Sequence, residues 1–181
     1  MIKAMVPLAD GFEELEAVTI IDILRRAGID VTTTYLKQNP VAGAHNLKVT
    51  ADRKIDEVDF SEYSLITLPG GLPGSSNLME DKRVISFITG VYERGGFVSA
   101  ICAAPMALGR AGVLKGKKAT CYPGFEDKMT GAKYVNDPVV VDGKVITGNG
   151  PGSAVHFALT LVEALMGSSK AEELRKGMLV K

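Results

Sequence analysis

Residues 96–114 read GFVSAICAAPMALGRAGVL, and this stretch decides the fold class. Its first part, Phe97–Ile101, is short and apolar, as expected of a buried strand. Cys102 and two alanines follow, and a helical pattern begins at Pro105. A strand that turns directly into a helix through small residues is the repeating unit of a parallel sheet with helices packed on its faces.

The same alternation continues on both sides of this stretch. Apolar or β-branched runs predict strands at residues 2–8, 30–36, 65–68 and, more weakly, 47–50 and 119–122. Helical patterns cover residues 12–27, 82–94, 105–111, 153–166 (with Ser153 as the N-cap) and 171–176. Asp142-Gly143 joins residues 139–141 to 144–147 and predicts a β-hairpin. We therefore expect an α/β fold with a mainly parallel sheet, helices on both faces and one small hairpin.

Length and charge narrow the class of protein. The chain has 181 residues, in which 21 Lys and Arg balance 21 Asp and Glu. This length predicts one domain over residues 1–181, and 46% hydrophobic against 23% charged residues is ordinary for a folded protein. A chain with no net charge and no long basic run gives no electrostatic reason to expect a nucleic-acid partner.

The N-terminal sequence bears on location. MIKAMVPLAD reaches an aspartate too early for a signal peptide, and no apolar run is long enough to span a bilayer. We therefore expect a cytoplasmic protein without a membrane partner. In a reducing compartment its two cysteines, Cys102 and Cys121, are expected to be free thiols.

A carboxylate falls on the apolar face of the first predicted helix. At 100° per residue, the apolar residues at positions 12, 20, 23 and 27 lie within about 40° of Glu16. A buried carboxyl group has a raised pKa and can donate a hydrogen bond or move a proton. The alternative is a structural role, in which Glu16 binds backbone N–H groups or pairs with Arg26. Glu13 and Glu14 are expected to be exposed and to complement the helix dipole.

Cys102 occupies the turn between a strand and a helix, as the nucleophile of a nucleophile elbow does. Ala103 and Ala104 allow a tight turn, and the following helix N-terminus is expected to stabilise the thiolate and lower the pKa of Cys102. A thiolate attacks carbonyl carbons and oxidises to sulfenic and sulfinic acid. The alternative is that Cys102 is a small buried hydrophobic residue, which is our interpretation of Cys121.

Metal and cofactor motifs are sparse. The histidines are His45 and His156, far apart in the sequence, so no metal site is expected. The glycine-rich turns LPGGLPGSS (68–76) and GNGPGSA (148–154) could present backbone N–H groups to an anion or a developing oxyanion. Tight turns at helix starts are the simpler explanation of each turn alone. Neither turn is a P-loop, because no Gly-Lys-Ser/Thr is present, and no cofactor is expected.

Four pieces taken together resemble the ThiJ/PfpI superfamily, and within it the DJ-one-like branch of parkinsonism-associated deglycases. They are LADGFEELEAVTIIDILRRAGI (8–29), LPGG (68–71), AICAAP (100–105) and GPGSAVHFALTLVEAL (150–165). The resemblance implies a flavodoxin-like three-layer sandwich that usually forms a homodimer. It also implies that Cys102 is the elbow nucleophile and that Glu16 hydrogen-bonds its sulfur. The N–H groups around Gly70, Gly71 and Ala103 would then form the anion-binding pocket.

The sequence departs from the pattern of this family at functional positions. Ala103 stands where peptidase-like members carry a histidine, so peptidase activity is not expected. Tyr122 stands where deglycase-like members often carry another histidine, which removes the usual general base. His45 falls near the position of a basic residue that the family can place beside the partner subunit's cysteine, although an ordinary surface histidine is the alternative. Tyr122, His45 and Arg26 are therefore candidate accessory residues.

Two functions of different classes fit this combination. The first is an enzyme that acts on a small aldehyde or a glycated substrate, as a glyoxalase or deglycase, with Cys102 adding to the carbonyl and Glu16 moving protons. The second is a redox-sensing stress-response protein or chaperone whose Cys102 oxidises to a sulfinate, which requires an activated thiol but no separate base. A non-catalytic binding domain on the same scaffold ranks last.

Overall fold

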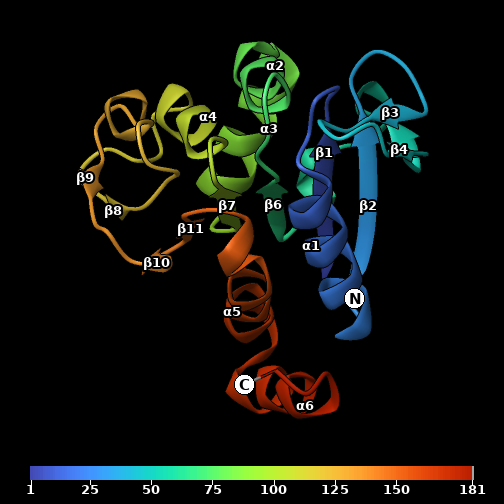
Figure 1. The fold of residues 1–181 in the computed structure, drawn as a ribbon, viewed down its shortest axis with the longest axis vertical. Helices are drawn as coiled ribbons and strands as arrows, with labels where there is room; N and C mark the ends of the chain where they lie inside the picture. The colour runs from blue at the N-terminus through green and yellow to red at the C-terminus, as the bar shows by residue number, and fades with distance from the viewer. Residues whose placement is uncertain (181) are drawn as a thin grey trace.

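A seven-stranded sheet forms the centre of the protein, which is described for residues 1–180 by a computed structural model (Figure 1). The strands lie in the order β10-β11-β7-β6-β1-β2-β5. Their bounds are Lys3–Leu8 (β1), Asp30–Tyr35 (β2), Arg53–Lys54 (β5), Leu65–Leu68 (β6), Phe97–Ile101 (β7), Val139–Asp142 (β10) and Val145–Gly148 (β11). All neighbours pair in parallel except β10 and β11, which form the hairpin expected at Asp142-Gly143.

Helices cover both faces of this sheet, so the expected three-layer α/β sandwich is confirmed (Figure 1). The helices are Glu14–Arg26 (α1), Gly74–Glu80 (α2), Lys82–Glu93 (α3), Pro105–Arg110 (α4), Ala154–Met166 (α5) and Ser168–Gly177 (α6). Short 3-10 turns cover Ile55–Glu57, Phe60–Glu62, Glu126–Lys128 and Pro151–Ser153. One core lies under α1 and α5, and the other lies under α2, α3 and α4.

The alternation of side chains along β1 explains the two cores. Ala4, Val6 and Leu8 enter the core shared with α1 and α5, whereas Met5 enters the core on the opposite face. Successive side chains of a strand point to opposite faces, and a strand buried on both faces is apolar throughout. This is why residues 4–8 include no polar side chain.

Several predicted elements differ from the observed ones. The weak strand expected at 119–122 is β8 (Lys118–Ala119), which pairs with β9 (Lys133–Tyr134) outside the main sheet. The helix α2 was not predicted, because glycine and serine at its start resemble a loop. Ser153 is the N-cap residue of α5, as expected, but its side chain makes no capping bond, because its hydroxyl donates to the Gly150 carbonyl at 2.9 Å.

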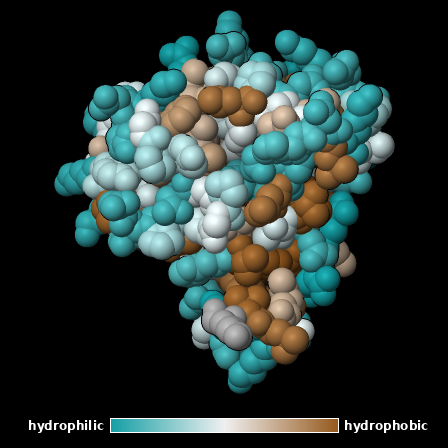
Figure 2. Space-filling view, in the orientation of Figure 1, coloured by the Kyte–Doolittle hydropathy of each residue, from teal (hydrophilic) through white to brown (hydrophobic). Residues whose placement is uncertain are grey.

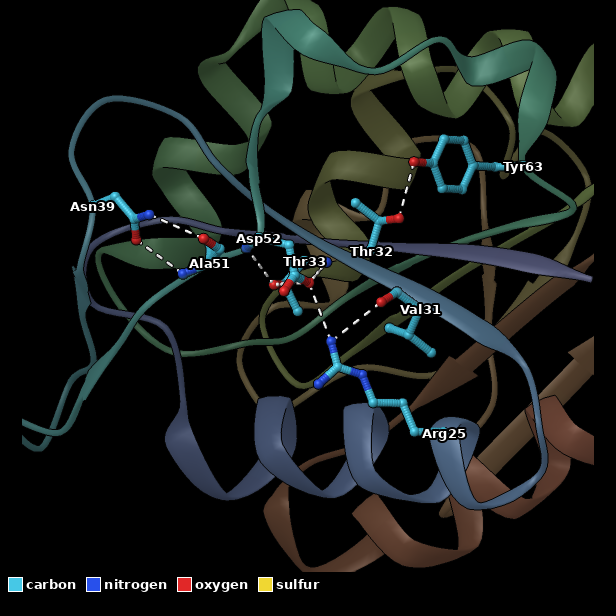
Figure 3. A network of polar contacts seen from close by, with 8 residues as sticks. All are labelled: Arg25, Val31, Thr32, Thr33, Asn39, Ala51, Asp52 and Tyr63. Carbon is cyan, nitrogen blue, oxygen red and sulfur yellow. Dashed lines mark hydrogen bonds and ion pairs between the residues drawn. The ribbon is translucent and has the colours of Figure 1, made fainter.

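A side-chain network fixes the segment that follows β2, where the sequence pattern is weakest (Figure 3). The Asp52 carboxylate accepts hydrogen bonds from the backbone N–H and hydroxyl of Thr33, at 2.8 and 2.6 Å, and from Arg25 at 3.1 Å. The Asn39 side chain bonds both backbone groups of Ala51. These contacts hold the short strand β5 on the edge of the sheet. The 41–49 region forms a separate small hairpin of β3 (Val41–Ala42) and β4 (Lys48–Val49).

Apolar side chains also reach the surface. Figure 2 shows hydrophobic residues gathered around the C-terminal helices α5 and α6. Further exposed hydrophobic residues include Leu15 and Val18 on α1 and Leu47 in the small hairpin. Across residues 1–180, each helix is too short or too polar to cross a bilayer.

Candidate active site

Cys102 lies in a strained turn at the carboxyl end of β7. Its backbone has φ 63°, in the left-handed region that residues other than glycine rarely adopt. Its N–H donates to the Gly148 carbonyl at 2.9 Å, and its carbonyl accepts from the Tyr122 N–H at 2.8 Å. Such strain persists only where neighbouring structure enforces it, and it is typical of a nucleophile elbow. The sharp turn expected between β7 and α4 is therefore present.

Glu16 lies in the first turn of α1 with none of its surface exposed. The Gly70 backbone N–H donates to its Oε2 at 2.7 Å. Its Oε1 is buried and has no hydrogen-bond partner within the described residues. Because Oε2 already accepts a hydrogen bond, Oε1 is the atom that holds the proton when Glu16 is neutral. The helical wheel therefore placed Glu16 correctly on the buried face of the helix.

The turn after β6 passes so close to Cys102 and Glu16 that it requires glycine. A Cβ at Gly70 would lie 2.6 Å from the Cys102 Cβ and 2.7 Å from the Glu16 Oε2. Gly71 has φ 88°, and a Cβ there would overlap backbone atoms of Gly11 and Glu13. Because no side chain stands at Gly71, its N–H can act on the Cys102 sulfur together with the N–H of Ala103, and both lower the pKa of the thiol.

The two ionisable groups shift each other's pKa. Burial raises the pKa of Glu16 from 4.5 to about 7, against the lowering effect of the Gly70 N–H and the Cys102 thiol. Burial also raises the pKa of Cys102 from 9.0 to about 12, and the negative charge of Glu16 contributes in the same direction. The lowered pKa expected for Cys102 was wrong. The N–H groups of Gly71 and Ala103 do lower it, but the loss of water around the sulfur outweighs them.

The mutual effect of Glu16 and Cys102 on their pKa values suits Glu16 for proton transfer. Because the Glu16 carboxylate raises the pKa of Cys102, the thiolate is favoured while Glu16 holds its proton. A carboxyl group with a pKa of about 7 is populated in both protonation states at neutral pH. It can therefore serve as both acid and base beside the sulfur.

Arg26 does not belong to the site. Its guanidinium pairs with Asp22 at 2.6 Å on the exposed side of α1. Ten residues of helix separate it from Glu16, which is about 15 Å along the axis. The alternative pairing of Glu16 with Arg26 was therefore wrong, whereas the backbone contact of Glu16 is present at Gly70.

His45 lies on the small β3–β4 hairpin, where it bonds Glu14 rather than Cys102. The Nδ1 atom of its ring is 2.8 Å from the Glu14 Oε2, and its backbone N–H donates to the Glu14 Oε1 at 2.6 Å. The expectation that Glu14 is exposed was wrong, because the hairpin folds over the start of α1 and buries this carboxylate. The Glu14 hydrogen bond raises the pKa of His45. Burial raises the pKa of Glu14, but the hydrogen bonds from His45 and from backbone N–H groups lower it overall.

Glu13 completes a cluster with Glu14 and His45. Ligand atoms of the three side chains lie within 4.8 Å of one another, so they could contact one metal ion. The ion pair between the exposed His45 and the two carboxylates accounts for the same arrangement without a metal. Sequence spacing could not reveal this cluster, because 31 residues separate Glu14 from His45.

Cys121 and Tyr122 differ sharply although they are adjacent. Cys121 is 1% exposed, and burial raises its pKa to about 11, as a structural role requires. Tyr122 is exposed, and its backbone contacts Cys102 while its ring lies over Gly150. The structure therefore joins the Tyr122 backbone to Cys102 and keeps Cys121 out of contact with solvent.

Known proteins resemble this chain over most of its length. The profile of the DJ-1/PfpI family matches residues 2–164. The chain belongs to the DJ-1/PfpI family. Protein DJ-1 homolog B from Arabidopsis thaliana is 43% identical over 175 residues, which are 95% of this chain and 40% of that protein. The chain thus spans less than half the length of this plant relative.

Other DJ-1/PfpI relatives match over most of their own length. The glutathione-independent glyoxalase DJR-1.2 of Caenorhabditis elegans is 36% identical over 91% of this chain and 88% of that protein. The crystal structure of Drosophila melanogaster DJ-1beta superposes with a TM-score of 0.95 at 39% identity, covering 99% of this chain and 98% of that one. Oxidized Toxoplasma gondii DJ-1 superposes with a TM-score of 0.94 at 35% identity, with the same coverage. These matches show the flavodoxin-like DJ-1 fold.

Proposed function

We propose that the protein converts small 2-oxoaldehydes into 2-hydroxy acids, with Cys102 as nucleophile and Glu16 as proton carrier. One observation carries the proposal: a buried carboxyl group with a pKa of about 7 lies beside a cysteine held at φ 63° in an elbow turn. The relation to a C. elegans protein named as a glutathione-independent glyoxalase supports the same class of reaction.

The reaction begins with addition of sulfur to the aldehyde. The Cys102 thiol gives its proton to the Glu16 carboxylate, and the sulfur bonds to the aldehyde carbon. The π electrons of the carbonyl move to its oxygen, which takes the proton from Glu16 to give a thiohemiacetal. While charge develops on this oxygen, the N–H groups of Gly71 and Ala103 are available as stabilising donors.

A proton shift completes the conversion. The Glu16 carboxylate removes the C–H proton of the thiohemiacetal carbon, and the neighbouring keto group becomes an alcohol by taking protons on its oxygen and then its carbon. The thiohemiacetal hydroxyl loses its proton, which leaves a thioester of the 2-hydroxy acid on Cys102. Water hydrolyses this thioester and restores the thiol. The sum is one aldehyde plus one water, so the reaction requires no external oxidant or cofactor.

Glu16 carries out these proton transfers without the help of a histidine. The family resemblance implies a histidine at the position of Tyr122. The two histidines of the chain lie elsewhere, since His45 is bound to Glu14 and His156 is on α5. A base with a pKa of about 7 has the same working range as an imidazole.

Lactate formation from methylglyoxal by the purified protein tests the proposal. We expect activity to be lost in Cys102→Ser and kept in Cys121→Ser, which is the matched control because that thiol is buried elsewhere. Glu16→Gln should also lose activity, since an amide cannot carry the proton. Equal lactate formation by wild type and Cys102→Ser would refute the proposal.

A second function, sensing of oxidants, is favoured by the donors around the sulfur. The N–H groups of Gly71 and Ala103 and the neutral form of Glu16 could each hydrogen-bond a sulfinate on Cys102. A related protein was solved in a form described as oxidized. After mild peroxide treatment, mass spectrometry should find two added oxygens on Cys102 and far fewer on Cys121. Equal oxidation of the two cysteines would argue against a specialised redox site.

We also propose that the protein works as a cytoplasmic homodimer built from one domain per chain. Leu15 and Val18 are exposed three residues apart on one face of α1, and Leu47 is exposed on the adjoining hairpin. Light scattering should give twice the mass of the chain, and Val18→Asp should give the single mass. A wild-type protein that remains monomeric at micromolar concentration would exclude the dimer.

A further inference from the structure

A cavity of about 220 Å³ lies where the parallel strands β1 and β2 end, and neither Cys102 nor Glu16 lines it. Three segments enclose this cavity: residues 8–10 at the end of β1, residues 36–38 and 41 after β2, and residues 77–81 at the end of α2. Ligands of open α/β sheets bind outside the carboxyl ends of the strands. The cavity therefore occupies a position at which this fold offers a binding site.

The inner part of the cavity is apolar. Leu8, Leu36 and Val41 line it and are buried, and Ala9 adds a fourth buried apolar side chain. The charged and amide side chains of the lining are partly or fully exposed, so polar groups surround the opening. A hydrocarbon chain that enters the cavity is removed from water by this apolar floor.

The Asp10 carboxylate in the wall is held in place by two uncharged donors. The Ala42 N–H donates to its Oδ1 at 3.0 Å, and the Gln38 amide donates to its Oδ2 at 3.2 Å. A carboxylate offers about four lone-pair sites, so both oxygens can accept further hydrogen bonds. The Asn77 amide donates to the Asp10 carbonyl at 3.1 Å, which leaves the Asn77 Oδ1 as another acceptor. The wall thus offers acceptors to a ligand that carries donors.

The charges of the lining are unbalanced. Three lining side chains are carboxylates and one is an ammonium: Asp10, Glu80, Asp81 and Lys37. Arg83 pairs with Asp81 and compensates its charge. Within residues 1–180, no Lys, Arg or His side chain forms an ion pair with Asp10 or Glu80. A ligand in the cavity therefore meets an excess of negative charge, which favours a cation and disfavours an anion.

We propose that this cavity binds a small organic cation, an alkylammonium or alkylguanidinium ion. The hydrocarbon stem packs on the apolar floor, and the N–H groups of the head donate to the Asp10 carboxylate and the Asn77 Oδ1. Cavities for drug-sized ligands measure roughly 300–1,000 Å³, so a cavity of about 220 Å³ fits a shorter molecule. The proposal does not depend on the proposed reaction, because the reacting groups do not line this cavity.

NMR titration of the whole ¹⁵N-labelled chain tests the proposal with ligands that share one butyl or butanoyl stem. Butylammonium and butylguanidinium carry a positive charge, butanol is neutral and butyrate is negative. The two cations should shift the amide signals of Lys37, Gln38 and Asn77, and should bind at least about tenfold more tightly than butanol or butyrate. The proposal is overturned if neither cation binds, if butanol or butyrate binds as tightly, or if the shifts centre on Gly71 and Ala103.

Variants that remove one charge separate this cavity from other acidic surfaces. Asp10→Asn keeps an oxygen that can accept the Ala42 N–H, and it should weaken cation binding about fivefold or more. Glu80→Gln removes a charge at the opening and should weaken binding about twofold. Glu93→Gln is the matched control, because Glu93 is exposed at the end of α3 and lies outside the cavity. If Asp10→Asn does not fold, Glu80→Gln decides alone, and unchanged affinity in the folded variants overturns the proposal.

Discussion

Replacing Glu16 by glutamine should stabilise the protein at neutral and alkaline pH and leave it nearly unchanged at acid pH. Glutamine keeps the shape of the side chain, and its carbonyl oxygen can accept the Gly70 N–H that now bonds Oε2. It cannot ionise, so it avoids a negative charge in a site from which water is excluded.

The size of the effect follows from the pKa of Glu16. Below pH 4.5 the carboxyl is protonated in both the folded and the unfolded chain, so it adds no pH dependence. Between 4.5 and about 7 the folded chain holds a proton that the unfolded chain has lost, and wild-type stability falls as pH rises. A shift of about 2.5 units at 1.36 kcal/mol per unit is about 3 kcal/mol, complete once the pH exceeds 7.

Urea unfolding of wild type and Glu16→Gln, measured from pH 4 to 8.5, tests this reasoning. The advantage of the variant in free energy of unfolding should grow by about 3 kcal/mol across that range. Glu163→Gln on the exposed side of α5 is the matched control and should show no such growth. A difference between Glu16→Gln and wild type that stays flat with pH would refute the buried, protonated carboxyl.

Three further predictions concern the surroundings of the pair. Gly70→Ala should lower the free energy of unfolding by about 1–3 kcal/mol and abolish lactate formation, because its Cβ would lie 2.6 Å from that of Cys102. Thermal or urea unfolding measures the stability, and wild-type behaviour of the variant would show that the turn can move aside. Cys102→Gly should be more stable than Cys102→Ala by about 1 kcal/mol, because φ 63° suits glycine, whereas Ala103→Gly should gain nothing. The NMR titration midpoint of His45 should lie above 6.5 and return toward it in Glu14→Gln, and equal midpoints would exclude the ion pair.

Local sequence patterns predicted the centre of the site. The apolar run before Cys102, the small residues after it and the start of α4 are neighbours in the chain, so their geometry follows from strand and helix preferences. Glu16 was found because the periodicity of one helix defines its buried face. Both predictions depend only on residues that are close together in the sequence.

Long-range packing produced what the sequence could not predict. The hairpin that carries His45 folds over the start of α1 and buries Glu14, which the helix pattern alone placed on the exposed side. The pKa of Cys102 is raised by burial among segments distant in sequence, a cause that the adjacent helix cannot reveal. The cavity at the ends of β1 and β2 forms from three segments that are distant in sequence, and no local pattern relates them.

The central claim is that Cys102 and Glu16 act as one proton-sharing pair. The rate of Cys102 alkylation as a function of pH, measured in wild type and Glu16→Gln on a Cys121→Ser background, tests it most directly. Removing the Glu16 charge should lower the pKa of the thiol by on the order of 1–3 units, so the variant reacts faster with the alkylating agent at pH 8 while it loses lactate formation. A midpoint that stays the same or rises in Glu16→Gln would contradict the pairing.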